Sequence, residues 1–520
     1  MNPEIYGVRD SRFGGKVHHY RGISYATISD RFAKPTLDTN WQKQGLTFRQ
    51  YGPRCPQPAF PMEGSMCLPT SNQQAAMIEE DEFTCCNLNI TTPVTDSKSR
   101  WPLYLWIHGG GQSVSFPSAQ HRLGDTGPLV AQSIEMRKPI ILVTINYRLN
   151  IFGFADPEGV NINLDLQDQA TAVNWVQKYI SLFGGDPENI TIGGQSAGAI
   201  YTHGLLAMGI GPKRVIMASG SLYLTAPQTR DRGLKLLRYI EHRLSSGESK
   251  GTMSNISAKE GDLLRKAPVH AIVKIFEEAK FYSWWMFDAP LGDWKNDLRV
   301  FGNVEAVLLS DCRDEGIPYE HRLRQSTKAE ILNAFKGLSG SDYTTLMSAY
   351  GLDATQAGHA QCVTMATDFV NDARYALWTQ EIWGQLQPVK KKVYLCHYDE
   401  VNPFGPWPTL GYSVAHHAVD LLAAFGGYDA EVNDATRNAG RLLRGKWIDF
   451  INGDEPWTPD MVYCIGPDGK SGPVPAGEIG PRRRYANFEI LKRIGIDSLT
   501  HIWQQLLPTE GVDTGDLWKL

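Results

Sequence analysis

The feature that most constrains this chain is a serine held between two glycines where a buried strand turns into a helix. The apolar run 190–192 leads into residues 194–198 (GQSAG), and a helical stretch follows. A G-x-S-x-G turn needs its glycines because the serine backbone is strained and the hydroxyl projects above the sheet. A glycine-rich turn with an ordinary serine is the alternative, but the strand before it and the helix after it favour a nucleophile at Ser196.

A second glycine-rich segment lies earlier in the chain. Residues 103–107 have the apolar pattern of a buried strand, and the sequence HGGG follows at 108–111. Backbone N–H groups of successive glycines can approach a substrate oxygen closely. Alone, three glycines are more often a flexible loop. Upstream of a nucleophile turn, we expect Gly110 and Gly111, together with Ala197, to form an oxyanion hole for a tetrahedral intermediate.

A serine hydroxyl needs a base to take its proton and a carboxylate to orient that base, in the chain order serine, acid, histidine. The loop 310–316 follows an apolar run and presents three carboxylates at a strand end: Asp311, Asp314 and Glu315. The residue pattern leaves all three open. The histidines that follow this loop are His321, His359, His397, His416, His417 and His501. A loop position before a helical stretch favours the adjacent pair at 416 and 417.

Short apolar runs alternate with helical patterns along the chain. The runs are 103–107, 140–145, 190–192, 215–218, 306–309 and 393–396, and helical spacing is clearest over 166–180. Continuous apolar runs are typical of strands that are buried on both faces. The alternation predicts an α/β fold with a central, mostly parallel sheet flanked by helices. Because no repeat or linker interrupts the pattern, we expect residues 1–520 to form a single domain.

Residues 229–303 depart from this alternation, since they have a helical pattern followed by many aromatic residues. The aromatic residues are Phe281, Tyr282, Trp284, Trp285 and Phe287. One interpretation is a cap insertion over a pocket, and the other is packing of these rings in the core. Both remain open.

Composition excludes several classes of function. The 520-residue chain has a formal net charge of -5, and its lysines and arginines are scattered, which argues against a nucleic-acid partner. No apolar stretch reaches the roughly 18 residues of a membrane span. The eight cysteines lack the spacing of a metal site, because the one close pair, Cys85 and Cys86, is adjacent. The polar N-terminus lacks the pattern of a secretory signal.

Beyond these motifs, the chain closely resembles the type-B carboxylesterase family, which includes cholinesterases and certain fungal lipases. The matching segments are RGISYA at 21–26, NYRL at 146–149, DQ at 168–169, WV at 175–176, FGGDP at 183–187, and Trp447 with Phe450. The resemblance covers nearly the whole chain. It implies an α/β-hydrolase fold with helical cap insertions, and hydrolysis of a small-molecule carboxylic ester without a cofactor.

The resemblance also selects among the candidate residues. The D-E-G loop that carries the family's acid matches 314–316 and selects Glu315, and the segment that begins with its histidine matches 417–426 and selects His417. His417 would take the proton of Ser196, and Glu315 would hold the imidazolium that forms. The product of this step would be an acyl-enzyme on Ser196, which water then cleaves.

Departures from the family pattern are informative. Gln195 stands where many relatives have glutamate, and no tryptophan resembling the choline-binding one precedes Cys85, so we expect a neutral or weakly polar ester rather than a choline ester. Gln112 replaces a frequent aromatic residue, which predicts an acyl pocket of different shape. Asn150 replaces a usual glycine.

Cysteine usage bears on the compartment. The resemblance implies a disulfide between Cys55 and Cys85 if the compartment is oxidising. No cysteine lies between Cys86 and Cys312, where relatives often have a second bridge. This missing bridge and the missing signal pattern together favour a cytoplasmic enzyme. The alternative is a secreted protein whose signal peptide has been removed, which would show the same pattern.

Two other functions share this sequence pattern. An acyltransferase or cyclase would use the same serine but pass the acyl group to an alcohol, an amine or an internal nucleophile. A non-catalytic binding protein would keep the fold and lose the chemistry. Such relatives typically lose residues of the triad, whereas Ser196, Glu315 and His417 are all present.

Overall fold

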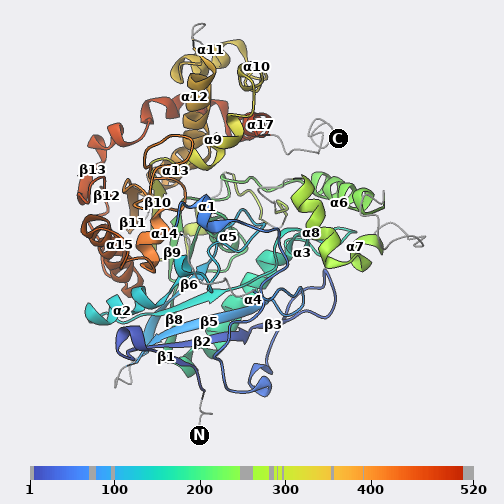
Figure 1. Cartoon of the computed structure of the whole chain (residues 1–520), viewed down its shortest axis with the longest axis vertical. Helices are drawn as coiled ribbons and strands as arrows, with labels where there is room; N and C mark the ends of the chain where they lie inside the picture. Colours follow the sequence, from blue (N-terminus) through green and yellow to red (C-terminus); the bar gives the residue numbers. More distant parts are fainter. Residues whose placement is uncertain are drawn as a thin grey trace.

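The protein is built around one large sheet (Figure 1). The computed structural model describes residues 5–69, 78–94, 100–245, 262–279, 286–289, 291–295, 298–352, 357–389 and 392–507. Within these ranges the sheet has 11 strands in the order β1-β2-β5-β7-β6-β8-β9-β10-β11-β12-β13. The strands are β1 Val8–Asp10, β2 Val17–Ser24, β5 Asn87–Pro93, β6 Trp101–Ile107, β7 Ile141–Ile145, β8 Gly185–Gln195, β9 Arg214–Ala218, β10 Ala306–Cys312, β11 Val393–Tyr398, β12 Met461–Ile465 and β13 Ser471–Pro475.

The sheet is parallel in its centre and antiparallel at its edges. Neighbouring strands from β7 to β12 pair in parallel, whereas β1, β2, β5 and β13 pair antiparallel. Each apolar run of the sequence lies in one of the parallel strands, so the predicted α/β architecture is confirmed. In the register, Ile107 at the end of β6 pairs with Gly194 near the end of β8. The glycine-rich segment and the nucleophile turn therefore leave the sheet side by side.

Helices cover both faces of the sheet. Successive residues of β6 point to opposite sides: Leu103 and Leu105 belong to one buried apolar cluster and Tyr104 and Trp106 to another. The first cluster includes residues of α4 Leu164–Tyr179 and α5 Ala197–Ala207, and the second includes residues of α2 Gly127–Glu135, α14 Asp420–Phe425 and α15 Asp434–Asn452. Burial on both faces explains why the sequences of these strands are unbroken apolar runs.

A third group of helices has an apolar cluster of its own, at the top of Figure 1. It is formed by α9 Ile317–Leu323, α10 Lys328–Asn333, α11 Gly340–Ala349, α12 His359–Asn371, the π-helical turn η6 Asp372–Ala376, α13 Leu377–Leu386, α16 Phe488–Ile494 and α17 Ile496–Leu506. This group brings α16 and α17 against the segment that follows β10. The sequence patterns did not single it out, because its helices come from two distant parts of the chain.

The segment 229–303 contains α6 Arg230–Ser245, α7 Asp262–Lys266, α8 Val269–Ala279 and η5 Leu298–Phe301, and its helices α6 to α8 lie together at one side of the molecule (Figure 1). Phe287 is buried and stacks on Phe154 with ring centroids 4.5 Å apart, so this ring packs in the core. Phe281, Tyr282, Trp284 and Trp285 lie outside the described residues. The cap insertion and the single domain stay predictions.

Short elements complete the chain. They are η1 Ser11–Phe13, β3 Ala26–Thr27, β4 Thr36–Leu37, η2 Trp41–Gln44, α1 Met62–Ser65, η3 Arg122–Gly124, α3 Asn150–Phe154, η4 Ile180–Phe183, η7 Ala476–Glu478, η8 Gly480–Arg482 and η9 Tyr485–Asn487. Among the helices that the structure describes, none has both the length and the apolarity to span a membrane.

All eight cysteines carry free thiols in the structure. Cys55 and Cys85 are both buried and their thiols interact, but the bridge that the family resemblance implied is not formed. The Cys55 sulfur instead accepts the backbone N–H of Leu149 at 3.2 Å. This contact fixes the chain just before Asn150.

Candidate active site

Ser196 occupies the strained turn between β8 and α5. Its backbone has φ 57° and ψ -121°, in a left-handed region that non-glycine residues rarely adopt. A side chain at Gly198 would lie 2.0 Å from the carbonyl oxygen of Ile107, so only glycine lets α5 start this close to β6. Ser196 is partly exposed, while the residues on either side of it are buried. The turn therefore lifts the hydroxyl off the sheet.

The loop after β6 packs directly against this turn. A side chain at Gly109 would come within 3.2 Å of the Cβ of Ser196, and one at Gly110, where φ is 105°, would collide with the carbonyl oxygen of Val114. In the part of the chain that the structure describes, no acceptor takes the backbone N–H of Gly110, Gly111 or Ala197. These three donors are thus free to bind an oxygen that forms beside Ser196.

His417 and Glu315 meet, although 102 positions separate them in the sequence. Nδ1 of His417 contacts a carboxylate oxygen of Glu315, and the other carboxylate oxygen accepts the backbone N–H of Cys312 at 2.7 Å. Glu315 is fully buried, and the His417 side chain is 15% exposed. Because Nδ1–H donates to the carboxylate, Nε2 is the nitrogen of the ring that is left to accept a proton.

The other two carboxylates of this loop have different partners. Asp311 lies in a buried network with His397 and Arg483, at 2.6 Å from each, where burial alone would raise its pKa but the interactions with Arg483 and His397 lower it to about 2. Asp314 accepts the backbone N–H of Ala415 at 2.9 Å. It therefore ties the acid loop to the histidine loop without touching the ring.

The remaining candidate histidines lie away from Glu315. His416 is buried, contacts Asn402 at 2.8 Å, and has its pKa lowered to about 4 by burial. His397 belongs to the Asp311 network, His359 contacts the carbonyl oxygen of Ser326, and His501 is exposed. His321 is exposed as well, although it lines the cavity described next.

Ser196 and His417 open into one cavity of about 630 Å³. Its wall comes from distant segments: the loop 58–66, the glycine-rich loop after β6, the segment 224–225, α8, α9, η6 and Trp407. The apolar lining residues include Phe60, Val114, Phe116, Ile200, Leu224, Phe276 and Trp407. The charged ones are Glu277, Arg322 and Arg374. α8 contributes Phe276 and Glu277, so the segment 229–303 forms part of this wall.

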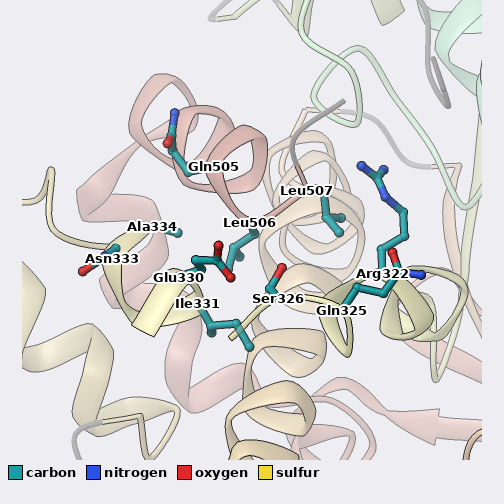
Figure 2. Close-up of a pocket in the computed structure, with 10 residues that line it drawn as sticks. All are labelled: Arg322, Gln325, Ser326, Glu330, Ile331, Asn333, Ala334, Gln505, Leu506 and Leu507. Atoms are coloured by element: carbon teal, nitrogen blue, oxygen red, sulfur yellow. The ribbon is translucent and has the colours of Figure 1, made fainter. Parts of the chain in front are cut away.

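A second hollow, of about 340 Å³, lies between α10 and the end of α17 (Figure 2). Its lining residues are Arg322, Gln325, Ser326, Glu330, Ile331, Asn333, Ala334, Gln505, Leu506 and Leu507. Glu330 already caps α10 through its contacts with Thr327. No histidine is among these residues, so this hollow does not hold a serine–histidine pair. Arg322 lines both hollows.

Nε2 of His417 has a partner other than serine in this structure. The side-chain Nε2 of Gln195 lies 3.2 Å from it and donates to it. Gln195 is fully buried, and its Oε1 has no hydrogen-bond partner among the described residues. The residue directly before the nucleophile therefore contacts the imidazole.

Three residues near the site carried no clear signal in the sequence. Asn150 has φ 48°, where glycine is the usual residue, and its side-chain amide donates to the carbonyl oxygens of Pro56 and Ser113 at 3.1 and 3.3 Å. It thus braces the glycine-rich loop, and its replacement of glycine was the one available hint. Arg374 and Tyr375 reach the cavity from η6, and no motif marked either residue.

Gln112 and Asp420 are two buried polar residues near the site. Gln112 does not line the cavity among the described residues. It is buried behind the glycine-rich loop, where its carbonyl accepts the N–H of Asn150 at 2.8 Å. Asp420 is buried beside Glu315, and burial first, with the charge of Glu315 second, raises its pKa to about 7. The described residues contain no cluster of side chains suited to hold a metal ion.

Comparison with known proteins gives consistent matches. Residues 4–290 match the profile of the Carboxylesterase family. Lipase 3 of Yarrowia lipolytica is 28% identical over 509 residues, which cover 95% of this chain and 96% of that protein. The para-nitrobenzyl esterase of Bacillus subtilis is 28% identical over 466 residues, which cover 85% and 87%. A solved structure of a PNB esterase superposes with a TM-score of 0.68 at 23% identity, covering 90% of this chain and 95% of that one.

Proposed function

This chain belongs to the carboxylesterase family and is a carboxylic ester hydrolase with the α/β-hydrolase fold, and from that premise we propose that it works through an acyl-enzyme on Ser196. In this proposal His417 is the general base and Glu315 orients it. Gly110, Gly111 and Ala197 supply the oxyanion hole. The single observation that carries the proposal is the contact between His417 and Glu315 at the cavity that Ser196 enters.

The first half of the reaction follows from these groups. Nε2 of His417 takes the proton of the Ser196 hydroxyl while Oγ attacks the ester carbonyl carbon. The carbonyl oxygen becomes an oxyanion, which the free backbone N–H groups of Gly110, Gly111 and Ala197 stabilise. The imidazolium then gives its proton to the leaving alcohol, the bond from carbon to that oxygen breaks, and the acyl group stays on Oγ. Glu315 stabilises the imidazolium throughout.

The second half regenerates the enzyme. A water molecule gives its proton to Nε2 of His417 and attacks the acyl carbon, and the oxyanion forms again in the same position. Its collapse breaks the bond to Oγ, which regains the proton from the imidazolium. The carboxylic acid leaves. Neither half changes an oxidation state.

The proposal requires Nε2 of His417 to exchange its hydrogen bond from Gln195 for one from Ser196. Gln195 donates to Nε2 in the structure, so Nε2 has to leave this hydrogen bond to accept the proton of Ser196. Catalytic hydrogen bonds often form only when the substrate is bound. We propose that the incoming ester carbonyl, by drawing the Ser196 hydroxyl toward His417, shifts the ring from Gln195 to serine.

For the substrate, we propose an ester without a cationic choline group. The residue before the nucleophile is the neutral Gln195, and many of the side chains around the cavity are apolar. The para-nitrobenzyl esterase and the lipase among the relatives act on esters according to their names, which supports a cavity for uncharged acyl or alcohol groups next to Ser196.

The test is a panel of para-nitrophenyl esters of increasing acyl length, with Ser196→Ala measured beside the wild type. We expect a burst of nitrophenol equal to the enzyme concentration in the wild type and no burst in Ser196→Ala. Ser326→Ala, in the second hollow, is the matched serine control and should keep the burst (Figure 2). Equal turnover by Ser196→Ala and the wild type would refute the proposal.

A further inference from the structure

We propose that the natural ester carries a carboxylate group away from the scissile bond, and that Arg374 binds this carboxylate inside the catalytic cavity. The inference rests on the proposed function, because it names the substrate class of the same cavity. It keeps the exclusion of a cationic choline ester and replaces the neutral ester that the sequence predicted with one that carries a distant acid.

Arg374 is a buried cation whose partners among the described residues are all neutral. Its side chain comes from η6 and is 7% exposed. Nε donates to the carbonyl oxygen of Leu224 at 3.1 Å, and Nη2 donates to the same oxygen and to the hydroxyl of Thr225 at 3.3 Å. The plane of the guanidinium lies over the ring of Trp503, 3.6 Å from its centroid. These contacts fix the group and leave its charge unbalanced.

Nη1 is the guanidinium nitrogen of Arg374 that remains available to bind a ligand. Its recorded contact is a long one, 3.4 Å to the hydroxyl of Tyr319. In the described part of the chain no carboxylate forms an ion pair with Arg374. By contrast, the other deeply buried arginines have acidic partners: Arg148 pairs with Asp168 at 2.7 Å, and Arg483 pairs with Asp311 at 2.6 Å.

An unbalanced buried charge is unfavourable, and folded proteins normally pair such a group. Here the group lines a cavity, so a ligand can supply the missing anion. A guanidinium held at two of its nitrogens by carbonyl and hydroxyl oxygens, and stacked on an indole, loses little freedom when it binds. Preorganisation of this kind suits a carboxylate, which accepts charge-assisted hydrogen bonds from the guanidinium edge.

Arg374 lies close to the reacting groups through its neighbour in η6. The ring of Tyr375 is 5.1 Å from the ring of His417, and its hydroxyl is 2.8 Å from that of Tyr319, which also contacts Arg374. One chain of contacts therefore links the proposed anion site to the general base. A π-helical turn such as η6 often occurs at a functional site.

The other charged groups of the cavity do not cancel this cation. Glu277 and His321 are exposed, and Arg322 is half-buried, so all three are better solvated than Arg374. Glu277 in addition accepts the backbone N–H of Ala59 at 3.3 Å. The buried part of the cavity is therefore positive, and the apolar walls around it accommodate the carbon skeleton between the ester and the acid.

Two pairs of substrates test the proposal and tell which side of the ester carries the acid. The acyl pair is mono-(para-nitrophenyl) adipate and para-nitrophenyl heptanoate. The leaving-group pair is the heptanoyl ester of para-hydroxybenzoate and that of para-hydroxybenzamide. We expect the wild type to have a kcat/KM at least about tenfold higher for the acidic member of one pair, mainly through a lower KM, after subtraction of the uncatalysed rate.

The variants are Arg374→Gln, Arg374→Lys and Arg441→Gln. Arg374→Gln should abolish the preference, measured as the ratio of kcat/KM for the acidic ester to kcat/KM for the neutral ester within this variant, and Arg374→Lys should restore part of the preference because it keeps the charge. Arg441→Gln, on the exposed surface beside Glu135, controls for net charge and should keep the full preference. The ratio of acidic to neutral substrate within one variant does not depend on how much protein is folded.

Two outcomes would overturn the proposal: a wild type that hydrolyses the neutral esters with no preference for either acidic one, or a preference that survives in Arg374→Gln. If instead Ser196→Ala hydrolysed the neutral esters as well as the wild type does, the proposed function would fail. The two proposals can therefore fail separately, because either outcome that overturns the anion site at Arg374 leaves hydrolysis at Ser196 intact.

Discussion

The side-chain amide of Gln195 donates to Nε2 of His417 across 3.2 Å, at the ring nitrogen that the proposed mechanism requires to accept the proton of Ser196. A carboxylate at the same position would favour the imidazolium, because an opposite charge stabilises the protonated form. The identity of this one residue thus bears on the pH range of catalysis.

Gln195→Glu should move the acid limb of the kcat/KM profile to higher pH, by about one pH unit, because imidazolium cannot act as the base. The measurement is kcat/KM for a para-nitrophenyl ester from acidic to neutral pH in both proteins. Gln195→Leu, which removes the donor without adding a charge, is the control and should shift the limb less. An unchanged acid limb in Gln195→Glu would show that the side chain at 195 does not act on the base.

Glu315→Gln should lower kcat by about a thousandfold or more, because the amide no longer holds the ring in the productive tautomer or stabilises the imidazolium. Asp314→Asn should lower kcat by less than about tenfold, because Asp314 contacts the backbone of Ala415 and not the ring. Both values are measured per active site after titration. The reverse ranking would move the acid to Asp314.

Asn150→Ala should destabilise the protein more than Asn150→Gly. Both variants lose the bonds to Pro56 and Ser113, at about 1 kcal/mol per bond, but alanine also has to adopt the left-handed backbone, which adds about 1–2 kcal/mol. Chemical denaturation gives the two free energies of unfolding. We also expect a lower kcat in both variants, because the glycine-rich loop loses its hydrogen bond from Asn150. An unchanged kcat would show that this hydrogen bond does not position the loop for catalysis.

Asp420→Asn should stabilise the protein increasingly as the pH rises. Burial raises the pKa of Asp420 from 3.8 to about 7, so between these values the folded state holds a proton that the unfolded chain has lost. This residue therefore makes the free energy of unfolding fall with rising pH, by ~1.4 kcal/mol per unit across that window. Asparagine does not titrate, so the free energy of unfolding of Asp420→Asn should exceed that of the wild type by more at neutral pH than near pH ~4.

The test compares the unfolding free energies of Asp420→Asn and the wild type at several pH values. Titration of all other groups is common to both proteins, so the difference isolates residue 420. A difference that does not change with pH would contradict the raised pKa.

Local sequence patterns predicted the buried strands and the glycine-rich turns of this protein. Apolar runs at 103–107 and 190–192 predicted buried strands of a mostly parallel sheet, and the structure pairs these two strands as neighbours. It also shows why glycines follow them, because a side chain at Gly110 or Gly198 would collide with backbone. Such features depend on a few neighbouring residues. The fold, and the identity of the nucleophile as a candidate, could therefore be predicted from the sequence.

Long-range contacts could not be predicted in the same way. The pattern around 311–315 offered three carboxylates of similar chemistry, and the family resemblance, not local physics, selected Glu315. In the structure, partners from distant segments distinguish the three carboxylates. Asp311 contacts Arg483 and His397, Asp314 accepts the backbone N–H of Ala415, and Glu315 contacts His417.

What the sequence by itself determined was the alternation of buried strands and helices and the strained turn at Ser196, since burial and backbone strain act over short stretches of chain. Only the tertiary structure decided which polar and charged groups lie together: the donor that Gln195 presents to His417, and the guanidinium of Arg374, which has no carboxylate partner in the described part of the chain and lines the same cavity. Electrostatic pairing depends on distances between groups that are far apart in the chain, and only the folded structure sets those distances.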